Sequence, residues 1–175
     1  MKPEIKRYVQ IYTGDGKGKT TAALGLSIRA SGHGLKTYMG QFIKGQHYGE
    51  LEALRDNLYI TIEQYGDKTC NGCEEIIQKH IDQAKQGLNM AYEAMISGEY
   101  DIIILDEINV AIWFKLLSVK EVIDFLDKRP ENIEIVLTGR NAPQELIEFA
   151  DLVSEIKEVK HYYCQGILAR NGIER

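Results

Sequence analysis

The sequence has no long apolar run, no long basic run and few cysteines. No apolar stretch approaches the roughly 20 residues that a membrane-spanning helix needs. The first ten residues, MKPEIKRYVQ, lack the apolar segment of a signal peptide. The formal net charge is −5, so bulk charge gives no reason to expect a nucleic-acid partner. We therefore expect a cytoplasmic protein that binds neither membranes nor nucleic acid.

The three cysteines are too few, and odd in number, for a disulfide framework, which suits a reducing compartment. Cys70 and Cys73 have the spacing of a metal-binding pair, but no second pair exists to complete four ligands. Cys164 and His80 or His161 would join them only if the fold brought them together. A zinc site and a loop with two free thiols both stay open, and the sequence favours the loop.

The chain has 175 residues, which fits one domain over residues 1–175. Short apolar segments alternate along it with longer segments of helical period. The predicted strands cover 7–13, 36–43, 58–65, 101–107, 133–139 and 152–159. Two predicted helices cover 19–31 and 74–97, and two more begin near Ser118 and near Pro143. This alternation predicts a three-layer α/β fold with a mainly parallel sheet. Ligands of such folds bind at the carboxyl ends of the strands.

The segment TGDGKGKTT follows the first predicted strand and resembles a phosphate loop. It is one residue shorter than the usual G-x-x-x-x-G-K-[ST] pattern, because only three residues separate Gly14 from Gly18. Glycine amides and a helix N-terminus form an anion site. Lys19 is placed to contact phosphate, Lys17 adds a second cation, and the hydroxyl of Thr20 is placed to bind Mg²⁺. An ordinary strand–helix turn is the weaker alternative.

The buried strand IIILDE ends in two carboxylates that complement this loop. At the carboxyl edge of the sheet, Asp106 or Glu107 would hold Mg²⁺ directly or through water. An exposed acidic strand end is the alternative. Arg140 follows another predicted strand, where it either lines the same cleft or forms a surface salt bridge.

Two aromatic segments have less definite roles. Trp113 and Phe114 lie in an apolar stretch with helical character, so we predict that they belong to the core. The segment KHYYCQG at 160–166 has no helical period. It is either a solvated end or a flap over the cleft.

Taken in order, five segments resemble the P-loop corrinoid adenosyltransferases: YTGDGKGKTTAALGLSIRASGHG, QFIKG, GEYDIIILDEINVA, RPENIEIVLTGRNAPQELIEFADLVSEIKEVKH and QGILARNGIE. The likeness covers nearly the whole chain and is weakest at about 46–80. It implies a RecA-like fold, a homodimer and transfer of the 5′-deoxyadenosyl group of ATP to Co(I) of a corrinoid, leaving triphosphate. It also implies a reduced flavoprotein as electron donor.

The same resemblance gives a meaning to the short loop. It implies that ATP lies reversed relative to ordinary P-loop enzymes, so that the loop grips the far end of the triphosphate and C5′ of the ribose is exposed. It assigns catalysis to Lys19, Lys17 and Glu107, and Mg²⁺ binding to Thr20, Glu107 and Asp106. It assigns ATP binding to Gly14, Asp15, Gly16, Lys17, Gly18, Lys19, Thr20, Thr21 and Arg29.

The sequence departs from this family in two places. Some members carry a Phe-x-Trp pair near the position of Gly66 that displaces the lower corrinoid ligand, whereas this chain has GDKTCNGCEE there. Tyr65 or His47-Tyr48 are candidates for that role, and we expect residues 65–73 to form a mobile loop beside the corrinoid. Only about six residues precede the first predicted strand, so we expect the N-terminal helix of some members to be short or absent.

Two other functions stay open at this point. One is a small-molecule kinase or another phosphoryl-transfer NTPase with the same loop. The other is a nucleotide-dependent binding module without turnover. The short loop and the extent of the resemblance favour adenosyl transfer.

Overall fold

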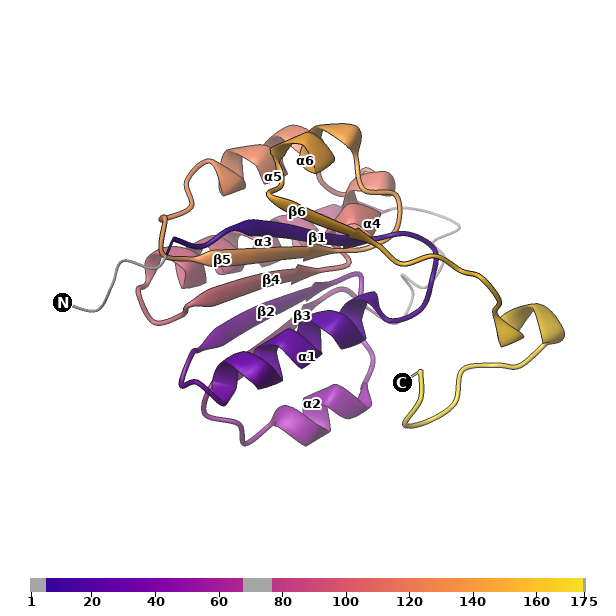
Figure 1. The fold of residues 1–175 in the computed structure, drawn as a ribbon. Coiled ribbons are helices and arrows are strands. Elements are labelled where there is room, and N and C mark those ends of the chain that lie inside the picture. The colour runs from indigo at the N-terminus through magenta and orange to yellow at the C-terminus, as the bar shows by residue number, and fades with distance from the viewer. Residues whose placement is uncertain (1–5, 68–76, 175) are drawn as a thin grey trace.

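The computed structural model describes residues 6–67 and 77–174, which form a parallel sheet of six strands with helices on both faces (Figure 1). The strands are β1 (Val9–Thr13), β2 (Thr37–Phe42), β3 (Ile60–Tyr65), β4 (Ile102–Asp106), β5 (Glu134–Thr138) and β6 (Leu152–Glu155). The helices are α1 (Lys19–Ser31), α2 (Gly49–Leu54), α3 (Gln78–Ile96), α4 (Ile108–Trp113), α5 (Val119–Leu126) and α6 (Gln144–Phe149), followed by the 3-10 helix η1 (Tyr162–Gln165). The predicted three-layer α/β fold is confirmed.

The strand order is β3-β2-β4-β5-β1-β6, and every neighbouring pair is parallel. Strand β5 therefore lies between β1, which leads into the glycine loop, and β4, which ends in the two carboxylates. This arrangement is consistent with a RecA-like P-loop fold. In the β2–β4 register Gln41 lies opposite Asp106, so the end of β2 reaches the carboxylates as well.

Two apolar cores hold the layers together because successive strand residues point to opposite faces of the sheet. In β4, Ile103 and Leu105 join the larger core under α3, α4, α5 and α6, whereas Ile102 and Ile104 join the smaller core under α1. All five residues of β4 are buried, as predicted for a strand inside a parallel sheet. The sheet is thus a rigid platform whose carboxyl edge carries the polar residues.

Helix ends match the sequence signals closely. Helix α1 covers the predicted residues and is capped by Gly32. Helix α5 begins at the predicted capping box, in which the Ser118 hydroxyl accepts from the Glu121 amide at 3.2 Å and the Ser118 amide donates to the Glu121 carboxylate at 2.7 Å. Helix α3 begins at Gln78 in the described part of the chain. The first predicted residues of that helix, at 74–76, lie outside the described residues.

Three features of the fold differ from the predictions. The last strand, β6, is exposed at all four residues, because it is an edge strand with β1 as its neighbour, so the predicted half-buried alternation was wrong. Trp113 was wrongly predicted as core, since 62% of it is exposed at the end of α4, whereas Phe114 packs against the larger core. The short helix α2 was not predicted, and α4 was predicted only as an apolar stretch of helical character without bounds.

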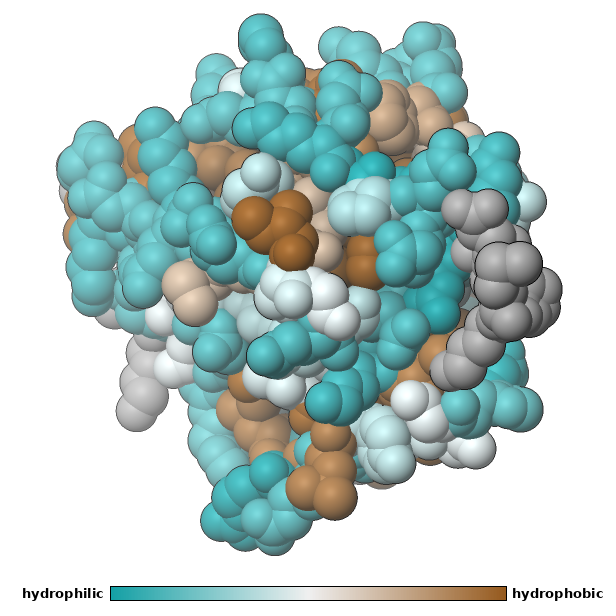
Figure 2. All heavy atoms as spheres, turned by 90° about the vertical axis from the view of Figure 1, so that its left-hand side faces the viewer, coloured by the Kyte–Doolittle hydropathy of each residue, from teal (hydrophilic) through white to brown (hydrophobic). Residues whose placement is uncertain are grey.

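The amino edge of the sheet, on the left of Figure 1, faces the viewer in Figure 2. It is mostly hydrophilic, and its apolar side chains are scattered, as on most protein surfaces. Within 6–67 and 77–174, no helix is long and apolar enough to cross a membrane.

Candidate nucleotide-binding site

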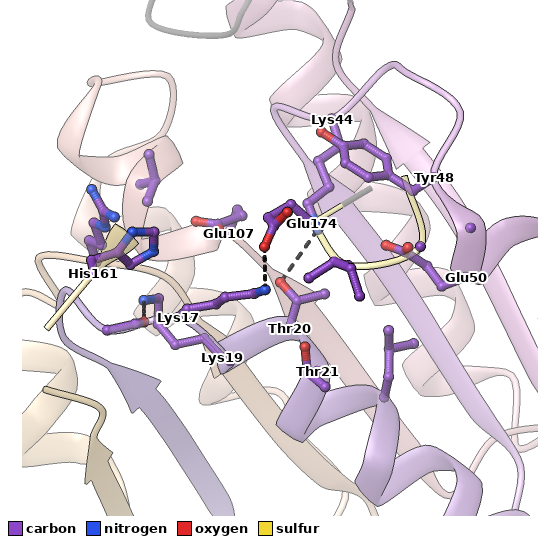
Figure 3. A pocket seen from close by; sticks show the side chains of 18 residues that line it. Lys17, Lys19, Thr20, Thr21, Lys44, Tyr48, Glu50, Glu107, His161 and Glu174 are labelled. Carbon is purple, nitrogen blue, oxygen red and sulfur yellow. Dashed lines mark hydrogen bonds and ion pairs between the residues drawn. The ribbon is translucent and has the colours of Figure 1, made fainter. Parts of the chain in front are cut away.

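A cavity of about 780 Å³ lies at the carboxyl edge of the sheet, where the predicted phosphate loop meets the ends of β2, β4 and β5. Figure 3 shows side chains from these elements pointing into it. Its lining residues are Gly16, Lys17, Gly18, Lys19, Thr20, Thr21, Leu24, Lys44, Tyr48, Gly49, Glu50, Glu107, Val110, Arg140, His161, Gly172, Ile173 and Glu174. Four of these side chains are cations and three are carboxylates, so the cavity offers partners both for an anionic ligand and for a metal ion that accompanies it.

Close packing explains the glycines of the loop. A Cβ at Gly14 would lie 2.5 Å from the carbonyl oxygen of Ile156, and one at Gly16 would lie 2.7 Å from the same atom. Gly14 and Gly18 also have positive φ angles of 94° and 121°, which disfavour other residues. The amide of Gly16 donates to the Ile156 carbonyl at 2.7 Å. That amide is therefore engaged within the protein, contrary to the expectation that it would face a phosphate.

Lys19, the first residue of α1, lies inside the loop. Its Nζ donates to the carbonyl oxygens of Gly14 and Gly16, at 2.6 Å each, and only 7% of the residue is exposed. Burial lowers the pKa of Lys19, while attraction to Glu107 opposes that shift. The ammonium group thus has carbonyl partners that an anionic ligand would replace.

Asp106 stands at the centre of a polar cluster. The carboxylate is fully buried, and its Oδ1 accepts hydrogen bonds from the Thr20 hydroxyl at 2.9 Å and the Thr138 hydroxyl at 2.7 Å. Its Oδ2 accepts from Lys44 Nζ at 2.7 Å and from Gln41 Nε2 at 3.3 Å. The structure therefore brings together the predicted Thr20 and Asp106 and adds three residues that were not predicted. The signal for Lys44 was present, since it follows β2 directly.

Glu107 lines the cavity beside this cluster. It has a left-handed backbone conformation, with φ of 62°, at the N-cap of α4, and its amide donates to the Thr138 hydroxyl at 2.9 Å. Burial, and next the repulsion of Asp106, raise the pKa of Glu107, whereas Lys44 and Lys19 oppose the rise. The strained backbone holds this carboxylate at the mouth of the loop.

The donor set fits Mg²⁺ better than zinc. Hard cations such as Mg²⁺ take oxygen ligands and keep part of their shell as water and phosphate. Thr20 and Glu107 provide oxygens that line the cavity, and the Thr20 hydroxyl donates to the fully buried Asp106, which does not line it. In the described part of the chain, no group of three or more His, Cys, Asp or Glu residues could hold a metal ion on its own. Cys70 and Cys73, the predicted thiol pair, lie outside the described residues.

Parts of the C-terminal segment line the cavity, namely His161, Gly172, Ile173 and Glu174. Lys17 Nζ donates to Glu174 Oε1 at 2.7 Å (Figure 3). It also donates to the Tyr162 hydroxyl at 3.0 Å. Hydrogen bonds from Arg170 and from Lys17 hold the pKa of the Glu174 carboxyl well below its usual range. Neither alternative that the sequence left open for 160–166 holds alone, because residues 163–166 are exposed, whereas His161 lines the cavity and Tyr162 accepts from Lys17.

Some predicted residues lie away from the cavity lining. Arg29 is exposed in the last turn of α1, and Asp15 is exposed, with its carbonyl accepting from Arg140 at 3.3 Å. Among the aromatic residues that were candidates for displacing the lower corrinoid ligand, Tyr48 lines the cavity. The Tyr65 hydroxyl instead forms a hydrogen bond of 2.7 Å with the Tyr38 hydroxyl. The predicted loop at 65–73 is described only to residue 67.

Known proteins resemble this sequence over nearly its whole length, a range that includes every residue of the cavity. A sequence model of the family described as ATP:corrinoid adenosyltransferase BtuR/CobO/CobP matches residues 5–175. A corrinoid adenosyltransferase of Sinorhizobium sp. is 34% identical over 99% of this chain and 82% of its own length. One of Escherichia coli K12 is 31% identical over 94% of this chain and 83% of its own length. A Nostoc protein is 37% identical over 95% of this chain, which spans 47% of that protein, about half its length.

Proposed function

This chain belongs to the ATP:corrinoid adenosyltransferase family, and on that premise we propose how the cavity at the carboxyl edge of its sheet carries out the reaction. The enzyme transfers the 5′-deoxyadenosyl group of ATP to the cobalt of a corrinoid and releases triphosphate. ATP and the corrinoid are its substrates. The corrinoid supplies the nucleophile, Co(I), so no side chain has to attack carbon. The residues of the cavity are left with binding, orientation and charge stabilisation.

The observation that carries the proposal is the set of cations around one cavity, formed by Lys17, Lys19, Lys44 and Arg140. When Co(I) attacks C5′, the C5′–O bond breaks and its electron pair passes to an oxygen of the triphosphate. Negative charge therefore grows on the leaving group. Fixed cations and amides placed around that group stabilise the transition state more than the ground state.

Two lysines change partners in this account. Lys19 exchanges the carbonyl oxygens of Gly14 and Gly16 for phosphate oxygens. Lys17 exchanges the carboxylate of Glu174 for a further phosphate oxygen. The first amides of α1 add to the anion site, because they have no acceptor within the helix. The triphosphate is thus held as one leaving group along the loop.

We assign Mg²⁺ as the cofactor of the same site. Thr20, Asp106 and Glu107 would hold the ion on the protein side. When bound, it neutralises charge on the triphosphate. The buried Asp106 and its hydroxyl partners orient the ligands, and because the pKa of Glu107 is raised by burial, protons compete with a cation for this carboxylate.

Further parts of the proposal rest on the family resemblance. They are the reversed orientation of ATP, a contact between Arg29 and the nucleotide, a homodimer and a reduced flavoprotein that supplies the electron for Co(I). The odd cysteine count supports a reducing cytoplasm as the compartment.

A matched pair of variants tests the site. Glu107→Gln should strongly reduce Co–C bond formation and its dependence on Mg²⁺ in an anaerobic assay with a chemically reduced corrinoid. Asp124→Asn, on α5 and paired with the exposed Lys120, should leave both unchanged. Equal and small effects of the two changes would show that the end of β4 is only structural.

A further inference from the structure

Lys44 makes the closest ion pair with the fully buried Asp106. It lies just after β2, only 14% of its side chain is exposed, and its Nζ is 2.7 Å from Asp106 Oδ2. The same Nζ is 3.4 Å from the hydroxyl oxygen of Thr20. Lys44 therefore contacts the two residues that, with Glu107, form the Mg²⁺ site of the proposed function.

The backbone around Lys44 is held in an unusual conformation. Ile43 has a positive φ of 63°, which is rare for a β-branched residue and costs conformational energy. Its amide donates to the Tyr65 carbonyl at 3.1 Å. Strain of this kind persists only where the surrounding structure determines it, and it concentrates at functional sites.

Two glycines show how tightly this turn is packed. A Cβ at Gly45 would lie 2.4 Å from the Cα of Asp67, and one at Gly66 would lie 2.5 Å from the carbonyl carbon of Ile43. The turns after β2 and β3 thus meet backbone to backbone. Lys44 is directed onto Asp106 by a rigid turn, unlike a surface lysine that samples many positions.

The electrostatics explain why a cation is needed at this point. A buried carboxylate without a counter-charge is strongly unfavourable. The Thr20, Thr138 and Gln41 side chains give Asp106 hydrogen bonds but no charge. Lys44 supplies the positive charge. A Mg²⁺ ion that reaches Asp106 and Thr20 would carry more charge to the same oxygens, so the two cations compete for one place.

We propose that Lys44 is a tethered cation that occupies the metal-binding side of Asp106 in the nucleotide-free protein and yields it to Mg²⁺ when the triphosphate arrives. This inference rests on the proposed function for the identity of the metal site. Released from Asp106, the ammonium stays in the cavity, which Lys44 lines, near the Tyr48 ring that now lies 5.2 Å away. There it adds a cation to the triphosphate. Lys44 thus weakens binding of metal alone and couples metal binding to nucleotide binding.

Titration of the nucleotide-free protein with Mn²⁺, followed by the electron paramagnetic resonance signal of the free ion, tests the competition. Lys44→Gln should bind Mn²⁺ alone at least tenfold more tightly than the unchanged protein. The control is Lys120→Gln, because Lys120 makes an ion pair of the same 2.7 Å length with Asp124 on the surface. The control should bind Mn²⁺ like the unchanged protein. Equal Mn²⁺ affinity in Lys44→Gln and the unchanged protein overturns the inference.

Titrations with Mn²⁺ and ATP together separate this inference from the proposed function. If Asp106→Asn weakens Mn²⁺ binding in the presence of ATP but Lys44→Gln does not tighten binding of Mn²⁺ alone, the metal site stands and the role of Lys44 is wrong. If Asp106→Asn and Glu107→Gln both leave Mn²⁺·ATP binding unchanged, the metal site itself is wrong and the inference falls with it.

Nuclear magnetic resonance of the unchanged protein tests the same displacement of Lys44 if Lys44→Gln does not fold. In protein labelled with ¹⁵N at lysine Nζ, the buried ammonium of Lys44 should give a slowly exchanging signal, assigned by its loss in Lys44→Arg. Addition of Mg²⁺ with an ATP analogue that cannot transfer its adenosyl group should shift that signal. A signal that stays unchanged while the analogue binds contradicts displacement of Lys44.

Discussion

Replacing Lys19 with alanine should remove the cation that is most deeply placed in the phosphate loop. Its Nζ donates two hydrogen bonds of 2.6 Å, to the carbonyls of Gly14 and Gly16. Both of these N–H donors become available to phosphate oxygens when ATP binds. A hydrogen bond to a charged group contributes roughly 1.5–3 kcal/mol. Each 1.4 kcal/mol of lost transition-state stabilisation is about a tenfold loss of rate. Two such bonds contribute about 3–6 kcal/mol together, so we expect kcat/KM to fall by about 10²–10⁴, the lower end being the loss found for single fixed donors to a developing oxyanion.

The fold should survive this substitution. Burial already lowers the pKa of Lys19, so its ammonium is costly to place in the loop. Gly16 lines the cavity, so water can replace the lysine at its carbonyl. Anaerobic Co–C bond formation gives the rate, and circular dichroism with urea denaturation checks the fold. Lys120→Ala is the matched control on an exposed helix face. A folded Lys19→Ala protein with kcat/KM within a few-fold of the unchanged enzyme would refute the reasoning.

Three further predictions follow from single contacts. Because the pKa of Glu107 is raised, protons compete with Mg²⁺ for this carboxylate at pH values above the ordinary carboxyl range. The affinity for Mg²⁺·ATP, measured by calorimetry, should therefore rise with pH in that range, and Glu107→Gln should lack this dependence. Glu174→Gln should tighten ATP binding by about two- to fivefold by freeing Lys17, and weaker binding would contradict the competition. Ser118→Ala should destabilise the protein by about 1 kcal/mol in urea denaturation, whereas Ser31→Ala, whose hydroxyl bonds within its own helix, should have little effect.

The layered fold was predictable because its signals are local. Strand β4 is a run of apolar residues between acids, α1 begins at the loop and ends before a glycine, and Ser118 begins a capping box. Each signal acts over a few neighbouring residues, so periodicity and caps were enough. Helices α2 and α4 have six residues each, too few for a clear period, and tertiary packing stabilises such short helices. The exposure of β6 depends on its place at the sheet edge, which a local pattern does not encode.

The site was predictable only where its residues belong to one motif. Lys19, Thr20 and the two acids at the end of the β4 segment, Asp106 and Glu107, follow from the loop pattern and the strand pattern. Lys44 reaches Asp106 because β2 pairs with β4, which is a property of topology and register. Glu174 meets Lys17 across a sequence separation of 157 residues. No spacing rule links such distant positions, so the sequence alone did not show that Gly172, Ile173 and Glu174 line the cavity.

The fate of the ATP carbon and phosphates tests the central claim most directly. The protein is incubated without oxygen with Mg²⁺, a reduced corrinoid and ATP carrying ¹³C at C5′, and the products are examined by carbon and phosphorus magnetic resonance. The account predicts that the labelled carbon becomes bonded to cobalt and that the three phosphates leave together as triphosphate. Labelled ADP without a Co–C bond would contradict it and would identify the protein as a phosphoryl-transfer enzyme.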